Sequence, residues 1–218
     1  MKILVGSDYH GDAQLQAEAL RQIPGVDVYI NCGDFCTWAG AKPDAQTSGY
    51  HPRGAEEVQQ LQQFFTAVDQ LAKPWLFVPG NHDPSASVLA EMARPWQHGR
   101  FVTQSELVWL WGLRVLAVPY TPPCGWNWTL TKPHLDELVA QYQNSTVDLL
   151  ITHAPPKGVL DEESRWYHRK TPTLRPLVDL LNPRYYLCGH MHLDGGKTET
   201  QGQTTFINAA LHNLLLEI

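Results

Sequence analysis

The sequence predicts an α/β (α+β) fold, a four-layer α-β-β-α sandwich of two mixed sheets flanked by helices. Apolar strands alternate with amphipathic helices early in the chain, as they do in parallel β-α units, whereas the later strands follow one another as hairpins. This mixture favours two sheets packed face to face over a single parallel sheet. In addition, short polar clusters directly follow the apolar runs, which is typical of a site built at strand ends.

The first half of the chain predicts three strands and three helices. The strands are apolar runs at residues 2–7, 26–32 and 75–78, and the helices span residues 12–22, 55–71 and 85–93. Asp12 suits the N-cap of the first helix, because its carboxylate can accept from free backbone amides. Residues 35–53 form a long stretch rich in Gly, Pro and Ser. A loop of this length inside a compact domain is usually functional or mobile.

The second half predicts a hairpin, two helices and further strands. Gly112 joins strands at residues 106–111 and 113–118. Thr131 caps a helix that has Pro133 in its first turn. The remaining expected elements are a Pro- and Trp-rich loop at 119–128, the body of this helix at 131–143, strands at 147–151 and 185–188, a helix at 174–181, and antiparallel strands at 197–200, 203–208 and 211–217.

The composition is that of an ordinary globular protein. Of the 218 residues, 43% are hydrophobic and 17% are charged, which suits one packed domain and excludes a disordered chain. Neither an internal repeat nor a low-complexity linker divides the sequence, so we expect a single domain over residues 1–218. The formal net charge of -6 argues against non-specific nucleic-acid binding. It is compatible with phosphate substrates, because bound cations would reverse the local charge.

The sequence also predicts a cytoplasmic protein without a membrane segment. The first apolar run ends at Asp8, which makes it too short for the core of a signal peptide, and no later stretch reaches transmembrane length. The four cysteines lack the spacing of a zinc ribbon, so we interpret them as buried, reduced thiols: Cys32, Cys36, Cys124 and Cys188.

Five polar clusters carry the chemistry. Each follows a short apolar run, and together they supply His, Asp and Asn, which are ligands for divalent transition metals. In chain order the clusters are Asp8-Tyr9-His10, Gly33-Asp34, Gly80-Asn81-His82-Asp83, Thr152-His153 and Gly189-His190-Met191-His192. This set is large enough for two metal ions, and a two-metal site is suited to cleaving phosphoesters.

The spacing within the clusters supports metal binding. Asp8 and His10 lie two residues apart, as do His190 and His192, so each pair shares one face of an extended segment. Five of the ten histidines fall inside the clusters. A single histidine is more often an ordinary surface or core residue, but five at strand ends favour metal ligation.

The ordered set D-x-H, G-D, G-N-H-D, T-H and G-H-x-H resembles the calcineurin-like metallophosphoesterase superfamily over residues 8–192. The resemblance implies a centre of two divalent transition metal ions (Mn, Fe, Zn or Co). One metal would be held by Asp8, His10 and His192, the other by Asn81, His153 and His190, with Asp34 as the bridge. It also implies that His82 protonates the leaving alkoxide or binds the phosphate, and that Asp83 orients the His82 ring.

The resemblance also narrows the subgroup. Protein phosphatases continue the second cluster as G-D-x-x-D-R-G, whereas this chain lacks that arginine after Gly33-Asp34. The chain is also too short for the extra segments of Mre11-type nucleases. Residues 122–128, 152–156 and 205–209 are similar to small stand-alone phosphodiesterase-like members, which are associated with cyclic nucleotides or other phosphodiesters.

Candidate substrate-binding residues lie mainly in the Trp-rich loop. Trp126, Trp128 and Tyr120 could stack on a nucleobase; packing of the loop against the core, or a dimer surface, explains them equally well. Weaker candidates are Tyr50, His51, Arg53, Arg165, Trp166, Tyr167, His168, Arg169 and Lys170. Asn208 either supports the site or forms a turn.

The resulting interpretation is a dimetal-dependent phosphoesterase. We expect hydrolysis of a cyclic or small nucleotide, or another phosphodiester, through attack by metal-bound hydroxide and without a covalent enzyme intermediate. The expected partner is this small-molecule substrate, and the sequence does not indicate an oligomeric state. The alternatives are a phosphomonoesterase on the same centre, a non-catalytic metal-binding scaffold, or a metal-free domain in which the clusters are ordinary turns.

Overall fold

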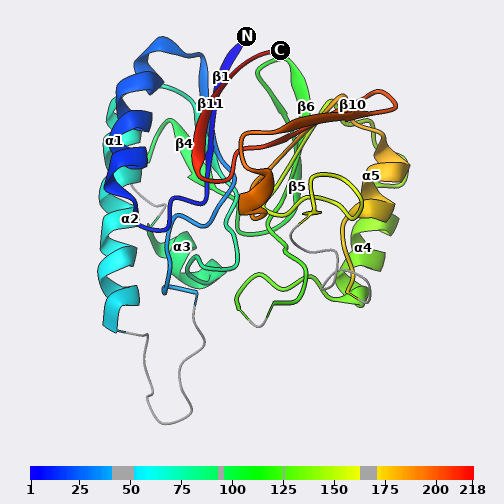
Figure 1. Ribbon diagram of the computed structural model, residues 1–218, viewed down its shortest axis with the longest axis horizontal. Coiled ribbons are helices and arrows are strands. Elements are labelled where there is room, and N and C mark those ends of the chain that lie inside the picture. Colours follow the sequence, from blue (N-terminus) through cyan, green and yellow to red (C-terminus); the bar gives the residue numbers. More distant parts are fainter. Residues whose placement is uncertain (41–51, 93–95, 125, 163–170) are drawn as a thin grey trace.

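The computed structural model describes residues 1–40, 52–92, 96–124, 126–162 and 171–218. Two sheets pack face to face, with helices on the outer side of each (Figure 1). These four layers confirm the predicted fold class. Tyr50, His51 and the candidates at residues 165–170 lie outside the described residues.

In the part of the chain that the structure describes, the first sheet has five strands in the order β11-β1-β2-β3-β4. The strands β1 to β4 run parallel, and β11 pairs antiparallel with β1. Their bounds are β1 (Lys2–Ser7), β2 (Val28–Asn31), β3 (Trp75–Phe77), β4 (Gly99–Phe101) and β11 (His212–Glu217). The sequence did not predict β4, because three residues are too few to show a period.

The second sheet has six strands among the described residues, in the order β5-β6-β7-β8-β10-β9. The four central strands are parallel, whereas β5 and β9 are antiparallel edges. The bounds are β5 (Glu106–Leu110), β6 (Leu113–Val118), β7 (Leu149–Thr152), β8 (Tyr185–Cys188), β9 (Thr198–Gln201) and β10 (Thr204–Asn208). The predicted hairpin is therefore β5–β6, closed by the pair Leu110 and Leu113.

Within the described residues, five α-helices form the two outer layers. The first three pack on the first sheet and the last two on the second (Figure 1). Their bounds are α1 (Ala13–Gln22), α2 (Pro52–Gln70), α3 (Ala86–Met92), α4 (Lys132–Tyr142) and α5 (Arg175–Leu181). The predicted caps are confirmed: Asp12 accepts from the amides of Gln14 and Leu15, and Thr131 accepts from that of His134.

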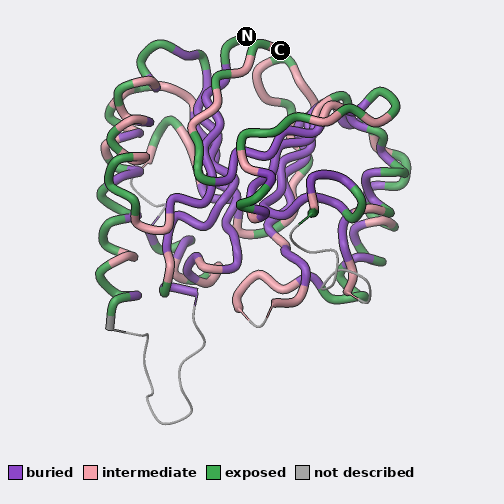
Figure 2. Tube along the Cα trace, in the orientation of Figure 1, coloured by how far each residue is buried: buried purple, intermediate pink, exposed green. Residues whose placement is uncertain are grey.

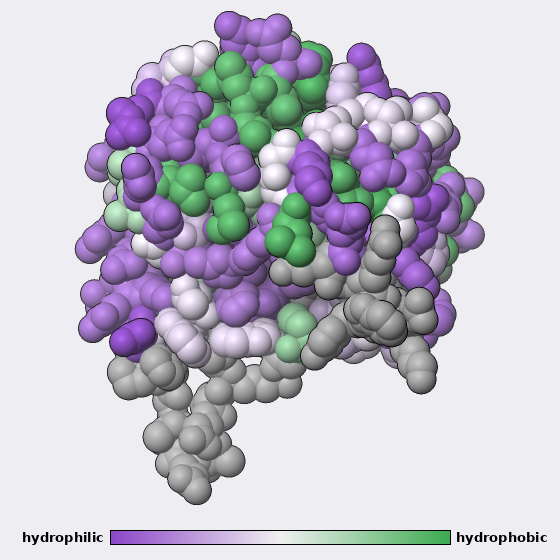
Figure 3. All heavy atoms as spheres, viewed as in Figure 1, coloured by the Kyte–Doolittle hydropathy of each residue, from purple (hydrophilic) through white to green (hydrophobic). Residues whose placement is uncertain are grey.

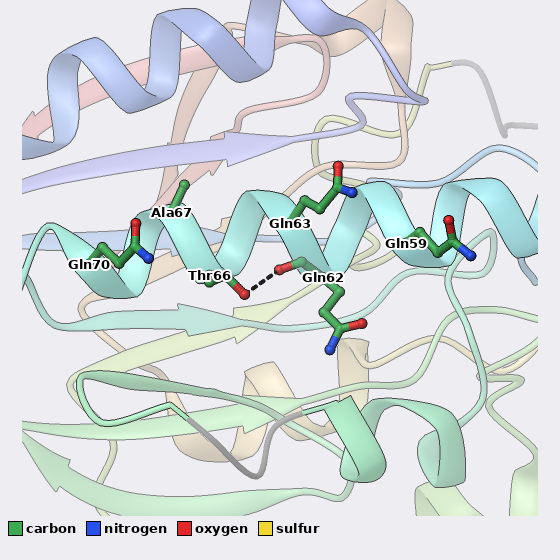
Figure 4. A pocket seen from close by; sticks show the side chains of 6 residues that line it. All are labelled: Gln59, Gln62, Gln63, Thr66, Ala67 and Gln70. Carbon is green, nitrogen blue, oxygen red and sulfur yellow. Dashed lines mark hydrogen bonds between the residues drawn. The ribbon is translucent and has the colours of Figure 1, made fainter.

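Helix α2 is amphipathic. Leu61, Phe64, Phe65 and Val68 are buried against the first sheet at helical spacing. The opposite face is polar and carries glutamines and Thr66, whose hydroxyl donates to the Gln62 carbonyl at 2.7 Å (Figure 4). The apolar face fixes the helix on the sheet, which in turn fixes the position of its first turns.

The core has three parts, one between the sheets and one under each helical layer. Successive strand residues point to opposite faces, so Ile3 and Val5 pack between the sheets while Leu4 packs under the helices. The β7 strand alternates in the same way. Figure 2 shows the buried trace concentrated in these central strands. Burial of one such side chain contributes about 1.5–3 kcal/mol, so the sheets form a rigid base for the loops at their ends.

The face of the molecule in Figure 3 is mainly polar, with its largest apolar area near the end of the sandwich where the two termini lie. All four cysteines are free, and Cys32, Cys36 and Cys188 are buried, as predicted, while Cys124 is partly exposed. Among the described helices, none combines the length and apolar character that crossing a membrane requires.

Candidate metal centre

The five polar clusters meet at one end of the sandwich. Asp8, Asp34 and Asn81 follow the parallel strands β1, β2 and β3, and His153 and His190 follow β7 and β8. Because parallel strands end at the same edge of a sheet, each sheet collects its own polar side chains there. The site therefore forms where the two edges adjoin.

One cluster contains Asp8, His10 and His192. The Nε2 atom of His192 lies 3.1 Å from Asp8 Oδ1 and 3.3 Å from His10 Nε2. His10 turns its other nitrogen, Nδ1, toward the Cys36 carbonyl at 3.2 Å. A carbonyl only accepts, so Nδ1 carries the proton and Nε2 presents a lone pair to the cluster.

The second cluster contains Asp34, His153 and His190. His153 Nε2 lies 3.1 Å from Asp34 Oδ2 and 3.2 Å from His190 Nδ1. His153 donates from Nδ1 to the Cys32 carbonyl at 2.6 Å, which again directs Nε2 into the cluster. Asp34 Oδ2 also lies 4.0 Å from His10 Nε2 of the first cluster. This carboxylate therefore faces both clusters, as a bridging ligand would.

Asn81 lies beside the second cluster. Its side chain is buried, and its Oδ1 is a buried polar atom without a hydrogen-bond partner among the described residues. Leaving such an atom unpaired costs about 1–3 kcal/mol. A divalent cation would satisfy it, which agrees with the donor set of the neighbouring histidines and carboxylates.

The backbone at the site is held in uncommon conformations. Asp8, His10, Asp34 and His190 have φ of 55°, 45°, 52° and 68°. Gly80 provides the room for this arrangement, because a Cβ there would lie 2.2 Å from Asp34 Oδ1 and 2.6 Å from His153 Cε1. The left-handed region is unfavourable for side chains other than glycine, and such residues gather at functional sites.

The electrostatics of the site depend on buried carboxylates beside His153. Burial opposes the charged form of His153, but Asp34 and Asp8 outweigh that effect and raise its pKa to about 9. Burial likewise opposes the charge on Asp34, yet His153 holds its pKa below the ordinary value. Positive charge is thus required between these carboxylates. Divalent cations would supply it in place of a protonated histidine.

His82 and Asp83 occupy different positions from those expected. The His82 ring donates from Nδ1 to the Thr37 carbonyl at 2.7 Å. Asp83 is fully buried and accepts from the amides of Asp34, Cys36 and Gly80 at 2.7, 3.1 and 2.8 Å. The prediction that Asp83 orients the His82 ring is therefore wrong. Asp83 fixes the backbone around the ligands instead, and Thr37 orients the ring.

Burial also acts on Asp83 itself. Together with the nearby Asp34 carboxylate, it raises the pKa of Asp83 to about 7. The three amide donors oppose this shift, because they stabilise the ionised form. Asp83 is thus a buried acceptor whose function is to hold loops together.

Comparison with known proteins identifies the family. Residues 1–194 match the calcineurin-like phosphoesterase family. The chain belongs to this family. Its members use a dinuclear divalent metal centre, and the two clusters above are the candidate positions for it.

Relatives of known sequence agree with this assignment. The human and mouse proteins called metallophosphoesterase domain-containing protein 1 are each 27% identical to this chain, over 87% of its length and 61% of theirs. The chain thus spans less than two thirds of the length of these two relatives. Among solved structures, that of TT1561 from Thermus thermophilus matches with a TM-score of 0.59 and 16% identity, over 96% of this chain and 88% of that one. This structural similarity supports the fold alone.

The aromatic residues that the sequence suggested for substrate binding separate into two groups. Trp126 lies against His82, with ring centroids 4.2 Å apart, and Trp38 lies 6.4 Å from Trp126. Trp128 and Tyr120 make packing contacts instead. Trp128 donates to the Pro84 carbonyl at 2.9 Å, and Tyr120 stacks on His134 with centroids 5.4 Å apart.

Several residues of the site were not expected from the sequence. Trp38, Thr37 and Asn127 are examples: Asn127 donates to the Asp83 carbonyl at 3.0 Å and docks the Trp-rich loop on the G-N-H-D segment. Asn208 was expected only as a support or a turn former. It is fully buried, donates to the Met191 carbonyl and accepts from the Ala210 amide, each at 2.9 Å, and so holds the segment between His190 and His192.

Proposed function

We propose that this chain is a dimetal-dependent phosphodiesterase that hydrolyses a cyclic or small nucleotide or a related phosphodiester. The observation that carries the proposal is the Asp34 carboxylate, which faces both histidine clusters. It also accepts from the amide of His82, the residue that follows Asn81 with its buried, unpaired Oδ1. A carboxylate shared by two cation positions is the arrangement that in-line cleavage of phosphoesters uses.

The ligands we assign are those that the resemblance implies. Asp8, His10 and His192 would hold one cation; Asn81, His153 and His190 would hold the other, with Asp34 between them. Two divalent cations supply Lewis acidity and a nucleophile at neutral pH. A mixed His, Asp and Asn set suits Mn, Fe, Zn or Co. Of these four metals, we propose manganese as the one to supply first.

His82 would act on the leaving group. Its Nδ1 is occupied by the Thr37 carbonyl, so Nε2 is the nitrogen that can give a proton to the departing oxygen or bind the phosphoryl group. Trp126 covers one side of the ring at 4.2 Å. It thereby limits the directions from which water reaches the imidazole.

The aromatic pair Trp38 and Trp126 supports a diester with a planar substituent. Trp126 lies against His82, Trp38 lies against Trp126, and Trp38 is 36% exposed. A base stacked on such a ring gains about 1–3 kcal/mol. A phosphomonoester lacks the second substituent, so it would make less use of this surface.

The test is hydrolysis of bis-p-nitrophenyl phosphate by purified protein with added Mn²⁺ and again after chelation, with p-nitrophenyl phosphate measured in parallel. We expect metal-dependent turnover, and a kcat/KM for the diester that exceeds that for the monoester by about tenfold or more. A preference for the monoester would favour the phosphomonoesterase. If protein that binds two metal ions hydrolyses neither ester and no member of a panel of cyclic nucleotides, the non-catalytic metal-binding scaffold is favoured.

The variant His82→Ala tests the proposed proton transfer independently of metal binding. It should keep the metal content of the parent and lose about 10²–10⁴-fold in kcat for substrates with poor leaving groups. The loss should be smaller for nitrophenolate, which leaves without protonation. An equal rate for the parent and the variant with an alkyl ester would remove His82 from the mechanism.

A further inference from the structure

We propose that Glu57 is a positioning residue of this centre, which sets the orientation of His82 from a distance by anchoring residues 36–40. Glu57 lies in the early turns of α2, outside both candidate metal clusters. The proposal rests on the proposed function, because it assigns to Glu57 a part in the same reaction. Glu57 belongs to none of the five polar clusters of the sequence.

The anchor is a single carboxylate oxygen. Glu57 Oε2 accepts from the backbone amides of Thr37, Trp38 and Ala39 at 3.0, 2.6 and 3.1 Å. Hydrogen bonds to an ionised acceptor are stronger than neutral ones. Three successive amides converge on one oxygen, so the backbone of residues 37–39 must curl around the Glu57 carboxylate.

The same short segment holds the two histidines through its carbonyl groups. The Thr37 carbonyl accepts from His82 Nδ1 at 2.7 Å, and the Cys36 carbonyl accepts from His10 Nδ1 at 3.2 Å. The Thr37 hydroxyl adds a bond to the His10 carbonyl at 3.0 Å. Thr37 thus makes both kinds of contact, since its amide donates to Glu57 and its carbonyl accepts from His82.

Close packing makes the segment a rigid link between α2 and the G-N-H-D cluster. The Gly40 amide donates to the His82 carbonyl at 2.7 Å, and a Cβ on Gly40 would lie 2.2 Å from the Asn81 carbonyl oxygen. On the other side, a Cβ on Gly54 would lie 3.1 Å from the Trp38 carbonyl oxygen. With backbone this close on both sides, a displacement of residues 37–39 passes directly to His82.

The consequence is a fixed tautomer of His82. While Thr37 stays in place, Nδ1 keeps its proton in both forms of the ring, so Nε2 is the nitrogen that takes up a proton to form the acid and gives it to the leaving oxygen. Without Glu57, three amides lose their acceptor and the segment can turn, which releases the ring. Partners of this kind that lie behind a site typically affect activity by about 10–100-fold.

The experiment compares Glu57→Ala and Glu57→Gln with Glu56→Gln. Glu56 is the exposed neighbour on the same helix, so its variant removes the same charge and leaves the anchor. The first measurement is long-range ¹H–¹⁵N NMR of the histidine rings in metal-free protein. The second is kcat and KM for bis-p-nitrophenyl phosphate with Mn²⁺.

For Glu57→Ala we expect loss of the Nδ1–H tautomer signal of His82 and a fall in kcat of about 10–100-fold with little change in KM. Glu57→Gln keeps a neutral acceptor and should show a smaller effect of the same kind, and it decides the matter if Glu57→Ala does not fold. Glu56→Gln should match the parent. A parent-like tautomer and kcat in the folded Glu57 variants would overturn the proposal.

The two proposals fail in different ways. If the parent does not hydrolyse any ester, the proposed function fails, while the NMR spectra still decide whether Glu57 orients His82. If the parent is active and the Glu57 variants keep both signal and rate, only the positioning role fails.

Discussion

Four residues around the candidate metal centre have left-handed backbone conformations: Asp8, His10, Asp34 and His190. Each costs about 1–2 kcal/mol relative to an ordinary conformation. Hydrogen bonds hold them there. The Asp8 carboxylate, for example, accepts from the Ser7 hydroxyl at 2.6 Å and from the His190 amide at 2.8 Å. The site is therefore shaped before a metal arrives, at the expense of local stability.

The buried, unpaired Asn81 Oδ1 leads to a prediction about stability and metal affinity. In Asn81→Ala, the affinity for Mn²⁺ should fall by about 10–100-fold, because a proposed ligand is lost. The free energy of unfolding of the metal-free protein should change little, because removing an unpaired polar atom offsets the lost packing. Calorimetric titration and chemical denaturation measure the two quantities.

A second buried asparagine provides the contrast. Both ends of the Asn208 side chain are hydrogen-bonded, to Met191 and Ala210. Asn208→Ala should therefore destabilise the metal-free protein by about 1–3 kcal/mol. If Asn81→Ala proves as destabilising as Asn208→Ala, the oxygen of Asn81 has another partner and its role as a ligand is in doubt.

At this scale the sequence predicted side chains better than backbone contacts. The candidate ligands could be named because His, Asp and Asn recur at fixed spacings after apolar runs. Thr37 and Glu57 could not, because their parts depend on a carbonyl and on backbone amides, which any residue supplies. The error over Asp83 has the same origin: its position next to His82 in the chain does not show which group its carboxylate meets.

At the scale of elements, the parallel strands bring the polar clusters together at one end of the sandwich. Hydrogen bonds at the opposite end of the second sheet keep two of these strands, β6 and β7, aligned. Asp148 precedes β7, and its carboxylate accepts from the amide, Nε and Nη2 of Arg114 on β6 at 2.8, 2.8 and 2.6 Å. These hydrogen bonds lower the pKa of Asp148 to about 2. The pair thus joins two neighbouring strands near their beginnings.

This pKa predicts a pH-dependent contribution to stability. Because the folded value lies below the unfolded value of about 3.9, the contribution is present above pH 4 or so and disappears as the pH falls toward 2. Asp148→Asn should cost about 1 kcal/mol at pH 7, a figure reduced for solvent screening of a partly exposed pair. Thermal melts of the parent and the variant from pH 7 to pH 2 measure it.

The exposed pair Arg175 and Asp179 on α5 is the control. Asp179→Asn should change the stability by less than about 0.5 kcal/mol at any pH. A gap between the parent and Asp148→Asn that stays constant down to pH 2 would contradict the linkage.

The elements were largely predictable, because strong periodicity and capping residues mark them. The boundaries moved by a few residues, as in the second strand, expected at 26–32 and found at Val28–Asn31. The placement of β11 was not predictable. It pairs with β1 across nearly the whole chain, and a contact at that separation leaves no local pattern in the sequence.

At the scale of the whole molecule, each candidate cluster combines residues from both sheets. Asp8 and His10 follow a strand of the first sheet, whereas His192 follows a strand of the second. A cation bound there would connect the two halves of the sandwich. Binding to the folded state alone stabilises it, since the unfolded chain does not bring these residues together.

Metal should therefore raise the melting temperature. At a free Mn²⁺ concentration of about 100 times Kd, one site contributes about 2.7 kcal/mol. For a chain of this size that corresponds to about 5–10 °C. Scanning calorimetry with Mn²⁺ and then with a chelator measures the shift. Asp34→Asn should lose most of the gain, and a gain equal to the parent's would show that Asp34 does not join the two cations.

The separation of the ligands along the chain also affects when a metal can be acquired in a cell. Asp8 and His192 lie 184 residues apart in sequence, yet their side chains meet at 3.1 Å. At about 5–20 residues per second, a ribosome needs roughly 10–40 s to make that span. During this time the emerging Asp8 and His10 have no second half to complete a site. A metal could therefore be held by this cluster only after His192 has been synthesised, and competition among cellular metals for it would be decided after that point.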